Sequence, residues 1–403
     1  MVWPVAGLKR TLGPLGAAGI GVASMVGAGA FYVWTPAAQL AGSLLWVSLT
    51  IAGAVALLNA VVVAQLALHN PVSGGAYRFG AKYVNTTAGF LAGWFFLVGK
   101  TASAAAIAVI AARYLYPDNP PLVAAALIAL FAVANISGIR TTAGISLAIA
   151  VLVVGSLVAI LSVAPWSGGE SEQAQLGSGW GVIQAAGLMF FAFAGYARMA
   201  TLGEEVKNPR IVLPRVIVGT LIGVLVLYAL IGTALVTSLG VEQVATSGAP
   251  LAELVPQAWT PLLVGAAALA SLGSLAAVLA GMSRTAMAMA QGNDLPPSLG
   301  LVWHRTSSPA IAEATMALGA IVAALLLDPI WLVGASSGAV LSYYAIAHAA
   351  AIKQPESERI LPVMTPYIGL TLCLFLVFTL PWSSIATGGV ILLLGLVLRA
   401  LRK

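Results

Sequence analysis

The stretch 22-VASMVGAGAFYVW-34 lies in the first long apolar run of the chain. A helix that crosses a membrane is expected to consist of strong helix formers, yet Gly27 and Gly29 stand two residues apart near the middle of this run. Glycine is common in membrane helices, where it lets neighbouring helices approach closely. Close packing therefore accounts for such a pair when it stands alone, and a break in the helix needs a second observation.

The composition around this stretch is that of a polytopic membrane protein. Of the 403 residues, 60% are hydrophobic and only 7% are charged, whereas soluble domains carry about 25% charged residues. No charged residue occurs between Arg10 and Arg78, and this interval is long enough for two spans of about 20 residues each. The single cysteine, Cys373, excludes a disulfide framework and a cysteine-based metal site.

Apolar runs separated by proline, glycine and charge clusters predict an all-α protein with twelve transmembrane helices. The predicted spans are residues 11–36, 40–67, 85–115, 121–138, 142–164, 180–203, 211–239, 258–290, 309–328, 330–352, 361–380 and 384–401. The connections between them are short, and no soluble domain or low-complexity segment interrupts them. Residues 1–403 are therefore expected to form one membrane domain.

Lysine and arginine residues predict the orientation, because cytoplasmic loops carry an excess of both. With the N-terminus in the cytoplasm, most of the 18 basic residues fall on the inner side. These are Lys9, Arg10, Arg78, Lys82, Arg140, Lys207, Arg210, Arg215, Arg284, Arg305, Lys353, Arg359, Arg399, Arg402 and Lys403. We therefore expect an integral protein of the plasma membrane with both termini in the cytoplasm. The same bias explains the net charge of +6 without a nucleic-acid partner.

A second irregular stretch, 190-FFAFAGYARMATLGEE-205, lies in the sixth predicted span. There an aromatic run meets Gly195 and, three residues later, the charged Arg198. Spans one and six occupy corresponding positions in two five-helix halves that enter the membrane from opposite sides. Glycine-interrupted helices at such positions indicate the binding site of a secondary transporter.

The physics of a helix break indicates what such a site binds. A break leaves unpaired N–H groups at the start of one half-helix and unpaired C=O groups at the end of the other, so one end attracts a carboxylate and the other an ammonium. An amino acid carries both groups. We expect amides around Ala28, Gly29 and Ala30 to receive the carboxylate and carbonyls of spans one and six to receive the ammonium. The predicted substrate-binding residues are Ser24, Met25, Val26, Gly27, Ala28, Gly29, Phe191, Ala192, Phe193, Ala194 and Gly195.

The chain resembles the amino acid–polyamine–organocation (APC) superfamily of permeases over most of its length. Four motifs carry the resemblance, and they occur in the order expected for that superfamily. They are 24-SMVGAGAF-31, 71-PVSGGAYRFGAKYV-84, 191-FAFAGYARMATLGEEVKNPR-210 and 282-MSRTAMAMAQGNDLP-296. Together these motifs are specific to the superfamily but not to one substrate.

The resemblance implies a LeuT-type fold with 5+5 inverted repeats and broken helices one and six. Residues 11–164 would form the first repeat, residues 180–352 the second, and residues 361–401 two peripheral helices. Phe191 matches the gating aromatic of the family. Two departures are notable. Ala28 stands where many relatives carry a polar residue, and Val153 stands where proton-coupled relatives of the cationic amino acid transporter type carry a lysine.

Lys100, in the third span, is the first candidate for ion coupling. A charge at the centre of a bilayer costs about 2.5–3.5 kcal/mol on insertion scales and usually faces a cavity or a partner. No acidic residue lies at comparable depth in the predicted spans. Lys100 is therefore either a proton carrier or a structural lysine that bonds hydroxyl and carbonyl groups.

The other coupling and gating candidates lie in spans six and eight. Arg198 either extends to carboxylates at the inner surface or contacts the substrate. Glu204 and Glu205, with nearby basic residues, are expected to form an inner salt-bridge network that holds a gate closed. Ser271 and Ser274 either help to bind a cation or bond back to their own helix, and we favour the second reading. The three histidines, His69, His304 and His348, are expected near the inner surface without forming a cluster.

These features favour a secondary active transporter that moves amino acids by alternating access, as a proton symporter or by exchange. Two cations near the site disfavour cationic substrates, so neutral L-amino acids are expected. Two alternatives stay open, namely an exporter of neutral amino acids and a non-transporting membrane subunit that binds a ligand. An enzyme is not expected, because clustered His, Asp, Glu or Cys residues at membrane depth are absent from the sequence. We expect no cofactor and no metal. The expected partners are an amino acid, protons, the lipid bilayer and a small accessory membrane subunit.

Overall fold

The computed structural model describes residues 12–70, 74–137, 143–167, 177–196, 199, 206–303, 305, 306 and 308–401. In these ranges every regular element is a helix, and the only β-type pairings are isolated bridges that join Leu12 to Val206 and Trp303 to Ser308. Eight of the described helices are long and apolar enough to cross a membrane, and four shorter apolar helices accompany them. The all-α prediction is therefore confirmed.

The long helices follow the predicted spans closely. They are α4 (Leu45–His69), α6 (Thr86–Leu115), α8 (Ala143–Val163), α9 (Gly179–Phe193), α11 (Pro209–Leu239), α14 (Thr260–Gln291), α16 (Pro329–Ile352) and α18 (Trp382–Leu401). The shorter apolar helices are α1 (Pro14–Met25), α7 (Pro120–Ile136), α15 (Ala310–Leu326) and α17 (Met364–Thr379).

The remaining elements are short. They are α2 (Gly29–Tyr32), α3 (Trp34–Ala41), α5 (Ala76–Phe79), the π-helix η1 (Gly80–Val84), the 3-10 turn η2 (Ala194–Tyr196), α12 (Val241–Thr246), α13 (Pro250–Glu253) and the 3-10 turns η4 (Gln257–Trp259), η5 (Pro297–Gly300) and η6 (Glu356–Glu358). The first predicted span is thus divided into α1, α2 and α3. The sixth ends as a regular helix at Phe193, and most of its predicted remainder lies outside the described residues.

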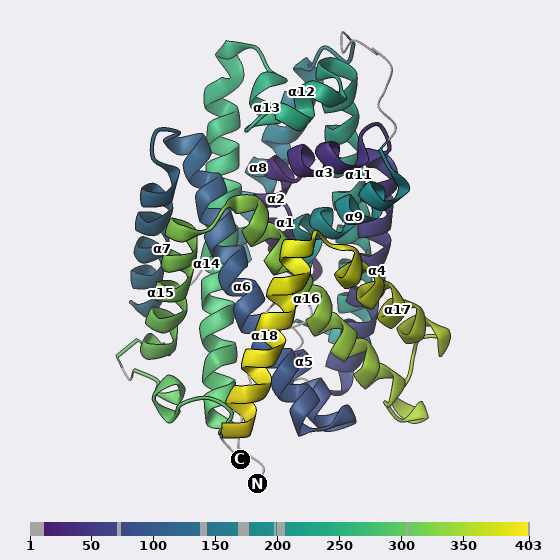
Figure 1. The fold of residues 1–403 in the computed structure, drawn as a ribbon, viewed down its shortest axis with the longest axis vertical. Coiled ribbons are helices and arrows are strands. Elements are labelled where there is room, and N and C mark those ends of the chain that lie inside the picture. Colours follow the sequence, from purple (N-terminus) through teal and green to yellow (C-terminus); the bar gives the residue numbers. More distant parts are fainter. Residues whose placement is uncertain are drawn as a thin grey trace.

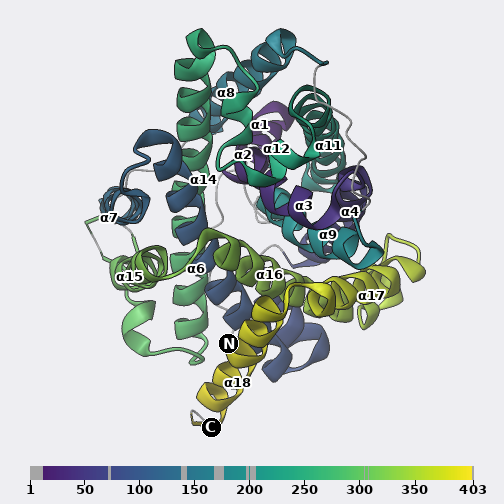
Figure 2. The ribbon, with the colours of Figure 1, turned by 45° about the horizontal axis from the view of Figure 1, so that its top comes forward.

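The helices surround α1, α2 and α3, which pass through the middle of the molecule (Figure 1). Helix α6 packs along both α14 and α16, while α7 and α15 lie together beside them in both views (Figure 2). Helices α8, α9 and α11 contact the α1–α3 segment, and α17 and α18 pack against α16. The first span therefore packs against helices that lie far apart in the sequence, and α1 stays open on one side, at Pro14 and Leu15.

Several spans begin at side chains that cap their first free amides. Asn85 accepts a hydrogen bond from the Ala88 amide at 2.7 Å, at the start of α6. Ser178 accepts one from Gly181 at 2.9 Å, at the start of α9. Such caps satisfy amides that have no partner within the helix, so they help to fix where these spans begin.

The helices at the two ends of the long axis carry different charged residues. Helix α5, which carries Arg78, and the end of α18, which carries Arg399, lie at the lower end in Figure 1. Helices α12 and α13, which carry Glu242 and Glu253, lie at the upper end. The basic end is held together by an ion pair between Arg399 and Asp294, and Tyr77 donates a hydrogen bond to the same carboxylate at 2.9 Å.

Candidate functional site

The first span is broken at the predicted place. Helix α1 ends at Met25, α2 begins at Gly29, and residues 26–28 between them are not helical. The Val26 amide still bonds to the Val22 carbonyl at 2.7 Å, but the Gly27 amide turns back to the Met25 carbonyl at 2.8 Å. The chain therefore leaves the helical path at Gly27.

The start of α2 exposes two free backbone donors. The amides of Ala30 and Phe31 bond to the carbonyls of Gly27 and Ala28 at 3.0 and 3.1 Å. The amides of Ala28 and Gly29 have no acceptor among the described residues. Unpaired amides at the start of a helix attract negative charge, so this end of the break has the chemistry to receive a carboxylate.

The second break lies against the first. Helix α9 ends at Phe193 and continues as the 3-10 turn η2. A Cβ atom added to Gly195 would lie 1.8 Å from the Ser24 carbonyl oxygen, and one added to Gly29 would lie 2.6 Å from the Ala192 Cα. No side chain fits at these distances, so only glycine lets the two backbones meet there. Close packing and a helix break, which the sequence offered as alternatives, thus occur together at Gly29 and Gly195.

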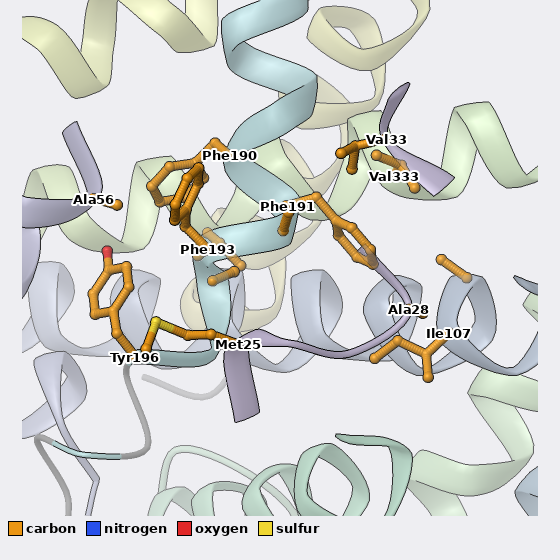
Figure 3. Close-up of a cluster of buried hydrophobic side chains, with 14 of the residues drawn as sticks. Met25, Ala28, Val33, Ala56, Ile107, Phe190, Phe191, Phe193, Tyr196 and Val333 are labelled. Atoms are coloured by element: carbon orange, nitrogen blue, oxygen red, sulfur yellow. The ribbon is translucent and has the colours of Figure 1, made fainter. Parts of the chain in front are cut away.

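The side chains around the breaks are buried and mostly apolar. Met25, Ala28 and Phe193 are each 2% exposed or less. Figure 3 shows the Phe191 ring on the side of α9 that faces Ala28 and Ile107, with Val33 and Val333 nearby. The predicted substrate residues of spans one and six therefore come together around an apolar region between α2, α6 and α9.

Tyr228 of α11 joins the two breaks, and the sequence analysis missed it. Its hydroxyl lies 2.9 Å from the Met25 carbonyl and 3.2 Å from the Ala192 carbonyl. One buried donor thus serves a carbonyl from each broken helix. Tyr228 is the only tyrosine in the seventh span, and this single aromatic hydroxyl in a largely apolar run was the available signal.

Lys100 lies at the carbonyl end of α9. Its side chain is 7% exposed, and its Nζ atom donates to the Ala194 carbonyl at 3.3 Å. This geometry agrees with the expectation of a lysine that bonds a carbonyl, and proton carriage stays a prediction. The lysine ammonium thus donates to one of the carbonyl groups that we expected to receive the ammonium of the substrate.

Helix α14 reaches the first break through its serines. A Cβ atom at Gly27 would lie 2.7 Å from the Ser274 Oγ atom. Ser274 bonds back to the Ser271 carbonyl at 3.0 Å, as favoured from the sequence. The Ser271 hydroxyl is buried and has no hydrogen-bond partner in the described part of the chain. These two serines therefore lie against the first span. Their hydroxyls alone do not form the cation site that was one of the two readings of the sequence.

Three predicted gating residues, Arg198, Glu204 and Glu205, lie outside the described residues. Their roles stay predictions. Across the residues that are described, no group of three or more His, Cys, Asp or Glu side chains is arranged to hold a metal ion.

A polar cluster appears where none was expected. His348 is fully buried in α16, and its Nε2 atom lies 2.7 Å from the Asn59 Oδ1 atom of α4. The Cys373 thiol of α17 donates to the same oxygen at 3.1 Å. The three histidines were expected to form no cluster with one another, and that expectation stays a prediction; the partners of His348 are instead side chains from two distant spans.

An open apolar groove runs along α1 between α8 and α11, with a volume of about 490 Å³. It extends from Pro14 to Val26, the first residue of the break, and among the described residues that line it Arg215 alone is charged. The groove thus approaches the break from the side of the molecule.

Comparison with known proteins agrees with this arrangement. The family model for amino acid permeases matches residues 12–398. An uncharacterised transporter of Mycobacterium tuberculosis (strain H37Rv) is 42% identical over 407 residues, which cover 98% of this chain and 92% of the relative.

More distant relatives carry substrate names. The branched-chain amino acid permease BcaP of Bacillus subtilis is 26% identical over 432 residues, covering 97% of this chain and 92% of that protein. The chloroplastic cationic amino acid transporter 7 of Arabidopsis thaliana is 26% identical over 429 residues, which cover 94% of this chain and 72% of that protein. The chain, with its two apposed helix breaks, belongs to the amino acid permease family of membrane transporters and is not an enzyme.

Proposed function

We propose that this protein is a secondary active transporter of neutral L-amino acids that works by alternating access. In this proposal the eight long and four shorter apolar helices form twelve spans of the plasma membrane, with a LeuT-type 5+5 core and cytoplasmic termini. The observation that carries it is the contact of the two breaks at Gly29 and Gly195, beside the free amides of Ala28 and Gly29.

The substrate carboxylate would bind the amides of Ala28 and Gly29, as anions bind at helix starts. The side chain of the substrate would face Phe191 and Ile107, which are apolar (Figure 3). This lining favours a neutral side chain, because an unpaired charge is costly to bury. The Lys100 ammonium nearby adds repulsion against lysine and arginine substrates. Among the relatives, the name of the Bacillus permease agrees with this preference and those of the Arabidopsis transporters do not.

Lys100 would couple the substrate to a proton. Its ammonium bonds to the Ala194 carbonyl at 3.3 Å, and a substrate ammonium would need the same carbonyl end of α9. The two cations therefore compete. Loss of a proton from Lys100 would weaken its bond to the carbonyl and leave that position to the substrate, so proton release and substrate binding would favour one another.

Alternating access would use the junction of the two breaks as its pivot. Backbone contacts at Gly29 and Gly195 and the shared Tyr228 hydroxyl keep spans one and six together. Movement of one helix set against the other would then open the buried site to either side. Glu204 and Glu205 stay candidates for an inner gate.

The test is transport in proteoliposomes. We expect labelled neutral amino acids to exchange with the same unlabelled amino acid inside. An outwardly directed proton gradient should drive their accumulation, because the proton and the substrate compete and are therefore exchanged. Lysine and arginine in excess should not compete. Exclusive transport of cationic amino acids would contradict the proposed substrate class. Ligand binding without any flux, inward or outward, would indicate a binding subunit instead.

The coupling residue is tested in the same vesicles. Lys100→Gln should retain exchange but lose accumulation driven by the proton gradient. Lys353→Gln, at an exposed lysine that follows α16, is the matched control and should behave as the wild type. Full gradient-driven accumulation by Lys100→Gln would exclude Lys100 as a proton carrier.

A further inference from the structure

In the buried cluster around His348, one amide oxygen has two hydrogen-bond partners and one ring nitrogen has none within the described ranges. Asn59 Oδ1 faces both the His348 Nε2 atom, at 2.7 Å, and the Cys373 thiol, at 3.1 Å. An amide oxygen can only accept, so His348 must carry its proton on Nε2 in this arrangement. The other ring nitrogen, Nδ1, then holds a lone pair, and it is buried with no partner among the described residues.

Three further buried polar atoms in this region form no well-aligned hydrogen bond in the described part of the chain, although the Tyr196 hydroxyl interacts with both Asn59 and Tyr344. They are the Asn59 Nδ2 atom and the hydroxyls of Tyr196 and Tyr344. Buried polar atoms are nearly always paired, and an exception needs an explanation. Here the Nδ1 atom of a fully buried ionisable ring is such an exception, within a membrane protein. Ionisable residues inside a membrane commonly mark ion or proton pathways.

The cluster is connected to the second helix break. Tyr344 lies one turn before His348 on the same face of α16. Its ring stacks on that of Tyr196 at a centroid distance of 5.2 Å, and Tyr196 is the last residue of η2. The Asn59 side chain also approaches the Tyr196 hydroxyl. In Figure 3 this hydroxyl points toward α4 beside Ala56, one turn before Asn59.

We propose that His348 is a second proton-binding residue of this transporter, and that Tyr344 and Tyr196 link proton binding at its Nδ1 atom to the break in the sixth span. A proton taken from water would convert the neutral ring to an imidazolium, and its release would restore the neutral ring. The proposal is separate from the role of Lys100 and rests on the proposed function only where transport is measured.

The side chains packed around His348 cannot accommodate both the neutral ring and the imidazolium without rearranging. The ring is fully buried, and a Cβ atom at Gly369 of α17 would lie 2.0 Å from its Cε1 atom. A cation held there would lose its hydration. Protonation therefore requires the surrounding hydroxyls to reorient or water to enter. Either change moves Tyr196, and with it the turn that ends the regular part of the sixth span.

The basic side chains on neighbouring helices contact groups other than His348. The titratable groups of this region are Cys373 from α17, which shares the Asn59 oxygen with His348, and Tyr344 from α16 and Tyr196 from η2, which interact with each other. The basic residues on the elements packed against α16 have other recorded contacts, namely Lys100 with Ala194, Arg78 with the Tyr77 ring, Lys82 with Asn70 and Arg399 with Asp294. In the described ranges, no carboxylate contacts the His348 ring.

The direct test reads the protonation of His348 without relying on transport. The chain has three histidines, so the double variant His69→Gln/His304→Gln leaves only His348 to carry a ¹⁵N label. In nanodiscs, we expect its ring nitrogen signals to change from the neutral to the charged form between pH 9 and pH 4.5. Tyr344→Phe in the same background should shift the midpoint of that change. A ring that stays neutral, with its proton on Nε2 over this whole range, would overturn the proposal.

A second measurement tests the role of the proton in transport. His348→Gln should keep at least half of the wild-type exchange rate of a neutral amino acid in proteoliposomes, and lose at least tenfold in accumulation driven by a proton gradient. His69→Gln is the control and should retain both. Wild-type accumulation by His348→Gln would overturn the proposal. If the wild type moves no amino acid at all, the proposed function fails, and the ring titration still decides whether His348 binds a proton.

Discussion

Two glycines carry the closest contacts of the candidate site. Gly29 faces the Ala192 backbone and Gly195 faces the Ser24 carbonyl, at distances where no side chain fits. Their positions were predicted from the sequence, because glycines in corresponding spans are an unusual pattern. The pairing between them was not predicted, since it depends on how two helices approach in space.

Gly29→Ala tests the contact between the breaks. The added methyl group would lie 2.6 Å from the Ala192 Cα, and overpacking of this kind costs about 1–3 kcal/mol. We expect a lower unfolding temperature and at least a tenfold loss of amino acid exchange. The matched control is Gly155→Ala in α8, where nothing lies within 4 Å of the added atom. It should keep wild-type exchange, and equal losses in both variants would contradict the account.

Tyr228 and His348 show why part of the site escaped prediction. Each lies in a largely apolar span, and its hydrogen-bond partners are on helices far away in the sequence. Tyr228 bonds carbonyls of α1 and α9, and His348 bonds Asn59 of α4. A sequence without its fold identifies such residues only as isolated polar positions.

Tyr228→Phe tests the shared hydroxyl. The ring would remain, but the Ala192 carbonyl would lose its Tyr228 donor, and an unpaired buried polar group costs about 1–3 kcal/mol. We expect a lower unfolding temperature and reduced exchange. Tyr367→Phe, at an exposed tyrosine of α17, serves as the control. Wild-type stability and exchange in Tyr228→Phe would show that the hydroxyl does not hold the breaks together.

The elements follow the sequence more closely than the individual contacts do. Apolar runs located the spans because burial in lipid requires long apolar helices, and glycine located the break between α1 and α2. The π-helix η1 was not predicted, since nothing in the local composition distinguishes it from an ordinary turn. The connections at the basic end of the molecule also depend on side chains from separate elements.

One such connection joins η1 to the segment between α16 and α17. Tyr83 donates a hydrogen bond to the Glu358 carboxylate, and Gln354 donates to the same oxygen at 3.3 Å. The bond from Tyr83 is the main reason that the pKa of Glu358 lies below its usual value, with smaller contributions from Gln354 and Lys82. The charged carboxylate therefore stabilises the folded protein.

This lowered pKa predicts a pH dependence. A carboxyl group whose folded pKa is depressed contributes stability above its unfolded pKa, near 4.5, and loses it as the pH falls through the folded value. At pH 7, Glu358→Gln should unfold at a lower temperature than the wild type, and the difference should shrink below about pH 4. Glu356→Gln, in the same 3-10 turn but exposed, is the control. A difference that does not depend on pH would mean that the carboxylate charge is not responsible.

At the scale of the whole molecule, the described helices pack around a first span that is broken between α1 and α2. The family was predicted from four motifs and is confirmed by the match over residues 12–398. The neutral substrate, the coupled proton and the orientation in the membrane stay proposals. Substrate choice and proton coupling depend on differences in affinity between conformations, and the orientation was inferred from the distribution of lysine and arginine.

The most direct measurement is a cryo-electron microscopy structure of the protein in nanodiscs with a neutral amino acid bound at saturating concentration. The account predicts the ligand carboxylate within hydrogen-bonding distance of the Ala28 and Gly29 amides, with its side chain facing Phe191. A ligand bound elsewhere, such as in the groove between α8 and α11, or with its carboxylate turned away from these amides, would contradict the claim that the two breaks form the substrate site.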